Sequence, residues 1–455
     1  MIFSSSLFLF CFLPIVFTVY HICGSKYKNA FLLLASIFFY AWGEPVYVLL
    51  MFASIILNYF LACWIEDLEN KTVRKFIFII AVVFDLFVLI FFKYMNFFVS
   101  NLSNIGIEIN GYHEIALPIG ISFFTFQIMS YVIDVYRKDV KAQRNCADLA
   151  LYISMFPQLI AGPIVRYIDI EHELKQREHN SIYEGIQRFM IGFSKKILLA
   201  DAIAPLGDYA FGKDGVTAGI AWFGLLAYTL QIYFDFSGYS DMAIGLGKMF
   251  GFTFMENFDY PYISKSIQEF WRRWHISLSL WFRSYVYIPL GGSRCSLAKC
   301  CRNLLIVFML TGFWHGANWN FIFWGLYYAV FLIVERVFLA KRIERWPVVC
   351  RRIYTLVVVM FGWVFFKVES LTDAFRYIGG MFRFSDGWWK EVLFRVNREY
   401  LFFLILGVVF ATPIGIKIKE KCNEKVYDFV VFGIFFVAIL YMVGNGFSPF
   451  LYFRF

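Results

Sequence analysis

Long apolar stretches recur from one end of this chain to the other, and they constrain its fold more than any other feature. Of the 455 residues, 60% are hydrophobic and 16% are charged, whereas soluble domains are about 45–50% apolar and about 25% charged. The stretch 76–92 lacks the alternation of a membrane β-strand. The sequence predicts an all-α, polytopic membrane protein and excludes a soluble enzyme, a disordered scaffold and a disulfide-stapled secreted domain.

The apolar stretches predict about eleven to thirteen transmembrane or re-entrant helices, because one crossing takes about 20 residues. We expect one membrane domain over residues 1–455, with N-terminal helices in 1–135, catalytic core helices in 136–345 and C-terminal helices in 346–455. The first stretch has no positive residue ahead of its apolar core, so a retained span is expected rather than a signal peptide. The expected spans lie near 3–22, 30–42, 45–63, 76–97, 117–135, 147–165, 186–204, 218–236, 303–333 (one span or two), 353–366, 400–416 and 427–444.

The basic residues predict the orientation in the membrane. There are 42 Lys and Arg against 33 Asp and Glu, a net charge of +9. In a membrane protein this excess indicates basic cytoplasmic loops rather than nucleic-acid binding. The loops 43–45 and 98–116 carry no Lys or Arg, and basic loops alternate with them, so both termini are expected outside. The segment 368–399 carries both acidic and basic residues and fits this pattern less well. The expected inside loops carry Lys26 and Lys28; Lys71, Arg74 and Lys75; Arg137, Lys138, Lys141 and Arg144; Lys341, Arg342, Arg345, Arg351 and Arg352; and Lys417, Lys419, Lys421 and Lys425.

Chemistry is expected in 235–325, the least lipid-like part of the apolar chain, because ionisable groups at membrane depth are costly. Within it, the spacing predicts one amphipathic helix over 269–285, suited to lie at the membrane interface or to re-enter the membrane. Its histidine can be a core residue of a membrane anchor or a functional group, and the pattern leaves both interpretations open. The aromatic face of this helix carries Trp271, Trp274 and His275, and the opposite face carries Arg272 and Arg273.

A second histidine, His315, lies within an apolar run from Asn303 to Val337. A helix of this length would extend about 52 Å, too long for one crossing of about 30 Å. Gly312, Gly316 and Asn318 favour a break near the histidine, and the two glycines also have a spacing that permits close helix packing. A neutral imidazole there can serve as a general base or can simply pack against a neighbouring helix.

The aspartates at the end of the span 218–236 allow two interpretations. Asp235 and Asp241 either cap or pair with an arginine, or they line a polar path for a substrate. The six histidines are scattered and no metal-ligand spacing occurs, so no metal site is expected. No nucleic-acid motif is present either.

Several long motifs resemble the membrane-bound O-acyltransferase (MBOAT) family. Within it they are similar to the bacterial branch that acetylates alginate or peptidoglycan, or that transfers D-alanine to teichoic acid. The likeness extends from the first span to the last residue. The motifs lie at 117–126, 157–163, 231–245, 270–283, which contains Phe-Trp-Arg-Arg-Trp-His275-Ile-Ser, 287–294, and 450–455.

The resemblance implies a ring of helices around a central tunnel in the bacterial cytoplasmic membrane. It implies that His315 is the catalytic histidine and His275 a second important one. The donor would be a cytoplasmic thioester, acetyl-CoA or an acyl carrier protein, and no tightly bound cofactor is expected. The acceptor would be a hydroxyl of an exported polysaccharide, or an extracytoplasmic partner transferase.

On this hypothesis His315 takes the proton of the accepting hydroxyl. His275 orients the thioester or stabilises the developing oxyanion. The expected roles of the remaining site residues are substrate binding and tunnel lining. The partners of the arginines would be either donor phosphates or lipid headgroups. The residues are Trp271, Trp274, Arg272, Arg273, Trp314, Asn318 and Asp235.

Three alternatives remain at this point. A D-alanyl group from a carrier-protein thioester is the alternative within the same chemistry. A proton-coupled transporter would use the buried histidines and aspartates as a relay, although no internal repeat of the kind frequent in transporters is evident. A non-catalytic platform for polysaccharide export is the third.

Overall fold

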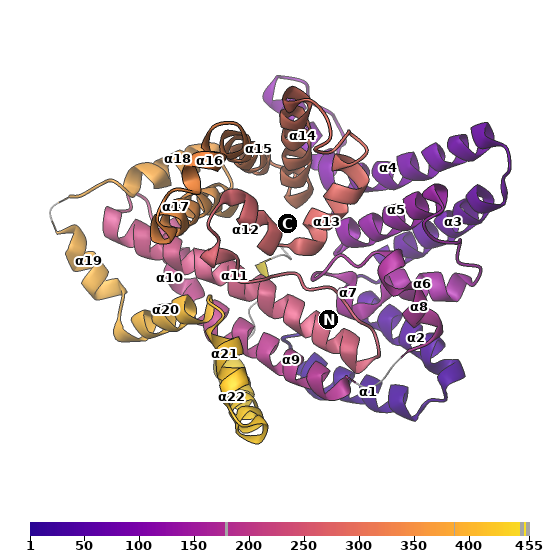
Figure 1. The fold of residues 1–455 in the computed structure, drawn as a ribbon, viewed down its shortest axis with the longest axis horizontal. Coiled ribbons are helices and arrows are strands. Elements are labelled where there is room, and N and C mark those ends of the chain that lie inside the picture. The colour runs from indigo at the N-terminus through magenta and orange to yellow at the C-terminus, as the bar shows by residue number, and fades with distance from the viewer. Residues whose placement is uncertain (178–180, 386, 446–449, 452–455) are drawn as a thin grey trace. The chain divides into compact units, whose positions relative to one another are not determined.

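The computed structural model describes residues 1–177, 181–385, 387–445 and 450–451 (Figure 1). Within these ranges the chain is helical, and the one strand-like feature is an isolated bridge between Phe258 and Trp274. The expected all-α class is therefore confirmed. The chain forms two compact units, Met1–Phe189 with Met242–Met255, and Met190–Asp241 with Glu256–Phe455.

The first unit consists of helices of different lengths that pack around aromatic side chains. Phe156, which starts a short helix, packs its ring edge-on against Phe12 at 5.3 Å. The expected loop 43–45, with the sequence Gly43-Glu44-Pro45, forms a turn between the second and third helices of this unit. Its helices are α1 (Leu13–Ile22), α2 (Lys28–Ala41), α3 (Tyr47–Asp67), α4 (Lys71–Asn104), α5 (Ile121–Arg137), α6 (Cys146–Ser154), α7 (Phe156–Leu159) and α8 (Tyr167–Lys175).

The second unit carries both histidines of interest. Two helices, α9 (Ile182–Ser194) and α11 (Ala218–Met249), contribute residues to each unit. The other α-helices of the second unit are α10 (Ala202–Gly212), α12 (Ile267–Arg273), α13 (Ile276–Phe282), α14 (Leu297–His315), α15 (Trp319–Val334), α16 (Ala340–Ile343), α17 (Val348–Lys367), α18 (Leu371–Gly380), α19 (Trp388–Arg395), α20 (Arg398–Phe410), α21 (Ile414–Lys421) and α22 (Glu424–Asn445).

Six helices in the described residues are long and apolar enough to cross a membrane, or seven if the bent pair of α20 and α21 is one span. Of the other expected spans, some coincide with single helices, as 218–236 does with α11, and others are divided into shorter helices. The stretch 147–165, for example, is broken between α6 and α7, where Pro157 cannot donate a backbone hydrogen bond. The protein is thus a multi-pass membrane protein. The six helices are Tyr47–Asp67, Lys71–Asn104, Leu297–His315, Trp319–Ile343, Val348–Lys367 and Glu424–Gly444.

Candidate active site

The segment 269–285 is not one continuous helix, and the expected amphipathic helix is wrong in this respect. Helix α12 ends at Arg273 and α13 begins at Ile276. Between them His275 has a φ of 45°, in the left-handed region that non-glycine residues rarely adopt. The π-helical segment η5 (Arg283–Tyr287) then follows α13.

The chain before α12 supplies the hydrogen bonds that this break removes. The backbone N–H of Ile276 donates to the Asn257 carbonyl at 3.0 Å, and that of Asp259 donates to the Arg273 carbonyl at 3.0 Å. The Asn257 side-chain oxygen accepts the Ser277 backbone N–H at 3.3 Å. A helix can end in the middle of an amphipathic pattern when another segment satisfies its terminal backbone groups.

The expected break near His315 is confirmed, because α14 ends at this residue and α15 begins at Trp319. Glycines allow these two helices to approach closely. A Cβ on Gly312 would lie 2.2 Å from the Phe321 carbonyl oxygen, and one on Gly325 would lie 2.2 Å from the Phe308 carbonyl oxygen. The hairpin therefore fixes His315 at the end of a rigid helix pair.

Aromatic rings surround His315, which is 4% exposed. Its ring centroid lies 5.1 Å from that of Trp324 and 5.2 Å from that of Phe366, both edge-on. Trp314 contacts both histidines, with centroids 5.0 Å from His315 and 6.1 Å from His275. The carboxyl end of α14 carries partial negative charge, which stabilises an imidazolium formed there.

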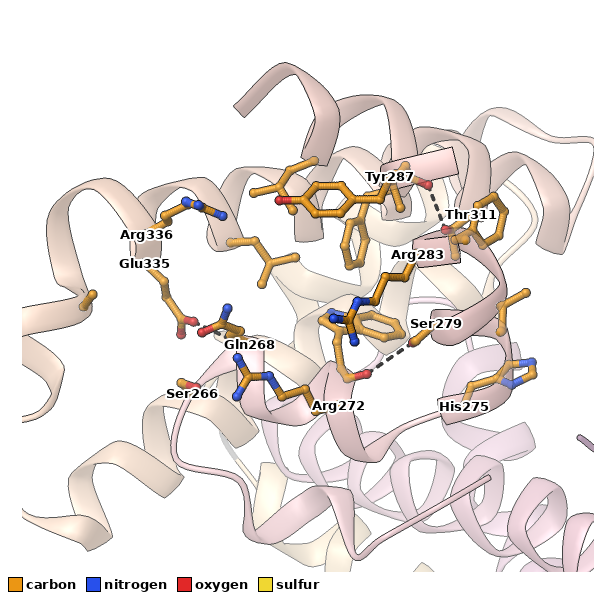
Figure 2. A pocket seen from close by; sticks show the side chains of 18 of the residues that line it. Ser266, Gln268, Arg272, His275, Ser279, Arg283, Tyr287, Thr311, Glu335 and Arg336 are labelled. Carbon is orange, nitrogen blue, oxygen red and sulfur yellow. Dashed lines mark hydrogen bonds between the residues drawn. The ribbon is translucent and has the colours of Figure 1, made fainter. Parts of the chain in front are cut away.

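One cavity of about 440 Å³ reaches both histidines. Figure 2 shows His275 among the residues that line it. Residues from both ends of the α14–α15 pair line the cavity. Thr311 and His315 lie at the end of the pair where α14 meets α15, whereas Arg336 directly follows α15 and Arg351 belongs to α17. The walls of the cavity are apolar over much of their area. The apolar lining comprises Trp271, Leu278, Phe282, Leu304, Val307, Phe308, Leu332, Ala340 and Ile343.

Positive charge predominates among the ionisable groups that line the cavity, with four arginines and two glutamates. One of the glutamates, Glu335, accepts the backbone N–H groups of Ile267 and Gln268 at 2.7 and 3.1 Å, and so holds the start of α12. In Figure 2, Arg272 and Arg283 extend toward the side from which Glu335 comes. The arrangement suits an anionic ligand with an apolar portion. The four arginines are Arg272, Arg283, Arg336 and Arg351.

The structure brings four of the expected site residues to this cavity, namely His275, His315, Trp271 and Arg272. Arg272 was expected on the face opposite Trp271, but these adjacent residues of α12 point only about 100° apart, and both line the cavity. The remaining expected residues do not line it. These are Trp274, Arg273, Trp314, Asn318 and Asp235.

Three of the expected site residues that do not line the cavity contact other parts of the second unit. Trp274 is 2% exposed and packs its ring against Trp363 at 4.8 Å. Arg273 forms ion pairs with Asp259 at 2.9 Å and Glu269 at 3.1 Å. The Asn318 side chain donates to the Glu369 carbonyl at 2.8 Å.

Asp235 belongs to a buried ion cluster. The Lys196 ammonium lies 2.6 Å from its carboxylate and 2.7 Å from that of Asp201. The backbone N–H of Leu451 donates to the other Asp235 oxygen at 2.9 Å. This arrangement matches the expected pairing of Asp235, although the partner is a lysine rather than an arginine.

Sequence reasoning missed Asn257, Arg283, Glu335 and Arg336. Asn257 lies outside every apolar span, so periodicity gave no signal for it. Both arginines were visible as basic residues near a motif or span. Arg283 lies in the π-helical segment η5 and Arg336 in the π-helical segment η6 (Glu335–Leu339), and these segments direct the two side chains toward the cavity. Among the described residues, no group of three His, Cys, Asp or Glu side chains is placed to hold a metal ion.

Comparison with known proteins gives the family of the chain. The model of MBOAT, the membrane-bound O-acyltransferase family, matches residues 143–372, which include both histidines. A probable alginate O-acetylase of Azotobacter vinelandii is 41% identical over 504 residues and covers 100% of each chain. The peptidoglycan O-acetyltransferase of Helicobacter pylori is 36% identical over 84% of this chain and 80% of its own. The teichoic acid D-alanyltransferase of Bacillus subtilis is 30% identical over 56% of this chain and 70% of its own. The chain therefore belongs to the membrane-bound O-acyltransferase family.

Proposed function

We propose that this membrane O-acyltransferase moves an acetyl group from a cytoplasmic thioester toward a hydroxyl on the other side of the bacterial cytoplasmic membrane. The observation that carries the proposal is the single cavity shared by His275, His315 and four arginines. Two relatives that cover 100% and 84% of this chain are named for acetyl transfer. Because the family is one of acyltransferases, the transporter and platform alternatives are not retained.

The direction of transfer follows from the charge pattern of the loops. The basic loop after α15 is expected on the cytoplasmic side, and the cavity begins there with Arg336 and Arg351. His315 lies at the opposite end of α14, roughly 28 Å along the helix at 1.5 Å per residue. A thioester whose anionic part binds the arginines can therefore extend its acyl end toward His315.

His315 acts as the general base in this proposal. It takes the proton of the acceptor hydroxyl, whose oxygen attacks the thioester carbonyl carbon. The carbon–sulfur bond then breaks, the carbon–oxygen ester bond remains, and the leaving thiolate receives the proton from the imidazolium. His275 lines the same cavity and orients the thioester. General-base catalysis of this kind is typically worth about 10²–10⁴-fold in rate.

The partners follow from the same direction of transfer. Acetyl-CoA or an acyl carrier protein supplies the thioester on the cytoplasmic side. An exported cell-surface polysaccharide, or an extracytoplasmic transferase that passes the group on, receives it on the other side. The similarity to a D-alanyltransferase favours D-alanine from a carrier protein as the second candidate for the transferred group.

The test is the acyl content of surface polysaccharides from a deletion strain, measured by mass spectrometry after complementation. We expect wild-type protein to restore acetyl esters and His315→Ala to leave them at least about 10²-fold lower. His113→Ala, which changes an exposed histidine outside the cavity, should restore them fully. Undiminished acetylation with His315→Ala at equal membrane levels would refute the role of His315, and D-alanyl esters in place of acetyl would establish the second candidate.

A further inference from the structure

Asn257 lies in the connection between α11 and α12 and is fully buried. Its side chain makes contacts in two directions. The amide nitrogen donates to the Ser240 hydroxyl at 3.1 Å. The amide oxygen lies 2.9 Å from the Ser277 hydroxyl, 3.3 Å from the Ser277 backbone nitrogen and 3.1 Å from Nδ1 of His275.

The Ser277 backbone N–H decides which way the Asn257 amide faces. An asparagine oxygen and nitrogen can be exchanged by a flip, so their assignment needs a partner of fixed character. A backbone N–H can only donate, and an amide nitrogen in the same position would face it as a second donor. The group that faces Ser277 and His275 is therefore the amide oxygen.

This orientation fixes the proton on His275. An amide oxygen has no proton to give, so the Nδ1 atom at 3.1 Å carries the hydrogen of that bond. The Ser277 hydroxyl lies 3.4 Å from Nδ1, but it donates its hydrogen to the nearer Asn257 oxygen at 2.9 Å. A neutral imidazole carries one N–H, which leaves Nε2 with its lone pair. The neighbouring rings, Phe236 at 4.7 Å and Trp314 at 6.1 Å, are not acidic and do not alter this assignment.

We propose that Asn257 is a positioning residue of the transferase, which holds His275 as the neutral Nδ1–H tautomer and so makes its Nε2 a hydrogen-bond acceptor. The role of His275 in the reaction rests on the proposed function, whereas the tautomer does not. His275 then accepts a hydrogen bond from an N–H or O–H group of a substrate, such as an amide N–H of the thioester's arm. A neutral His275 in this tautomer cannot donate from Nε2 to an oxyanion.

The surroundings of His275 keep it neutral. It lies between α12 and α13, outside the six spanning helices, and burial lowers the pKa of its imidazole to about 3. The other ionisable groups that line its cavity are His315, Tyr287, Glu335, Glu344 and the four arginines. Phe236 of α11 and Trp314 of α14 face the ring with uncharged side chains. At working pH His275 therefore stays an acceptor.

The first experiment reads the tautomer directly in the wild-type protein. Membranes that contain protein with ¹⁵N-labelled histidine are studied by solid-state NMR, and the His275 signals are assigned by their loss in His275→Gln. We expect Nδ1 to show the chemical shift of a protonated nitrogen and Nε2 that of an unprotonated one. The reverse pattern, or an imidazolium at neutral pH, would overturn the proposal whether or not the protein transfers acetyl groups.

The second experiment measures the pH dependence of kcat/KM for acyl transfer by purified protein in vesicles. In Asn257→Asp a carboxylate faces Nδ1, and an opposite charge at this distance raises a histidine pKa by about 1–3 units. A raised pKa means that His275 becomes charged as the pH falls, so the acidic limb should move to higher pH. Activity should return toward the wild-type value at alkaline pH, because the carboxylate still accepts from Ser277.

The control for Asn257→Asp is Asn397→Asp, the same chemical change at an exposed helix cap, which should leave the pH profile unchanged. A profile of Asn257→Asp that superimposes on wild type, or one lowered equally at every pH, would contradict the positioning role. If wild-type vesicles transfer no acyl group at all, the proposed function fails, while the NMR result still decides the tautomer.

Discussion

Two consecutive arginines of α12 have different surroundings. Arg272 lines the cavity, and neither it nor Arg283 has an ion-pair partner among the described residues. Arg273 instead pairs with Asp259 and Glu269. An unpaired guanidinium in an apolar-walled cavity is a strong point of attraction for phosphate or carboxylate. Arg272 and Arg283 are thus better suited to bind the donor than Arg273.

We predict that Arg272→Gln or Arg283→Gln raises KM for the thioester about ten- to hundredfold and changes kcat little. A charge-assisted hydrogen bond contributes about 1.5–3 kcal/mol, and about 1.4 kcal/mol is a factor of ten. Initial rates at varied donor concentration give both constants. Arg273→Gln is the matched control and should stay within about threefold of wild type, because exposed ion pairs contribute little. Equal KM values for all three variants would argue against phosphate contact at the cavity.

At the scale of elements, the α14–α15 pair depends on glycines that have no room for a side chain. We predict that Gly312→Ala and Gly325→Ala each destabilise the protein by about 1–3 kcal/mol, because overpacking forces the helices apart. The loss would appear as a lower midpoint of thermal unfolding in detergent, with reduced activity because His315 moves. Gly433→Ala in α22, where an added Cβ meets nothing within 4 Å, should not lower the midpoint. A midpoint unchanged in all three would contradict the close packing.

The elements also show how far the sequence predicts this site. The break after His315 was predictable, because the apolar run is too long for one crossing and contains two glycines. The break at His275 was not, because the local pattern of 269–285 remains amphipathic throughout. What interrupts that helix is the backbone and side chain of Asn257, 18 residues upstream of His275, and no periodicity reports such a pairing. Arg283 and Arg336 share this difficulty, since both lie in π-helical segments that shift the direction of their side chains.

At the scale of the whole molecule, a buried ion cluster links distant parts of the second unit. We predict that Lys196→Met destabilises the protein by about 3–5 kcal/mol, because it leaves the buried Asp235 and the partly buried Asp201 without their cation. Thermal inactivation of solubilised protein measures the effect. Lys175→Met, which removes an exposed partner of Glu171, should cost less than about 1 kcal/mol. A similar tolerance of both substitutions would show that the cluster is not a stabilising element.

The same cluster gives the protein an order of assembly. Asp235 receives the backbone N–H of Leu451, 216 residues further along the chain, and Lys196 lies 4.8 Å from the ring centroid of Phe450. During synthesis, α11 emerges from the ribosome long before residues 450–451 exist. The Asp235 carboxylate therefore lacks the hydrogen bond from Leu451 while the intervening helices enter the membrane. A chain that ends before residue 451 would therefore leave one Asp235 oxygen without this donor inside the second unit.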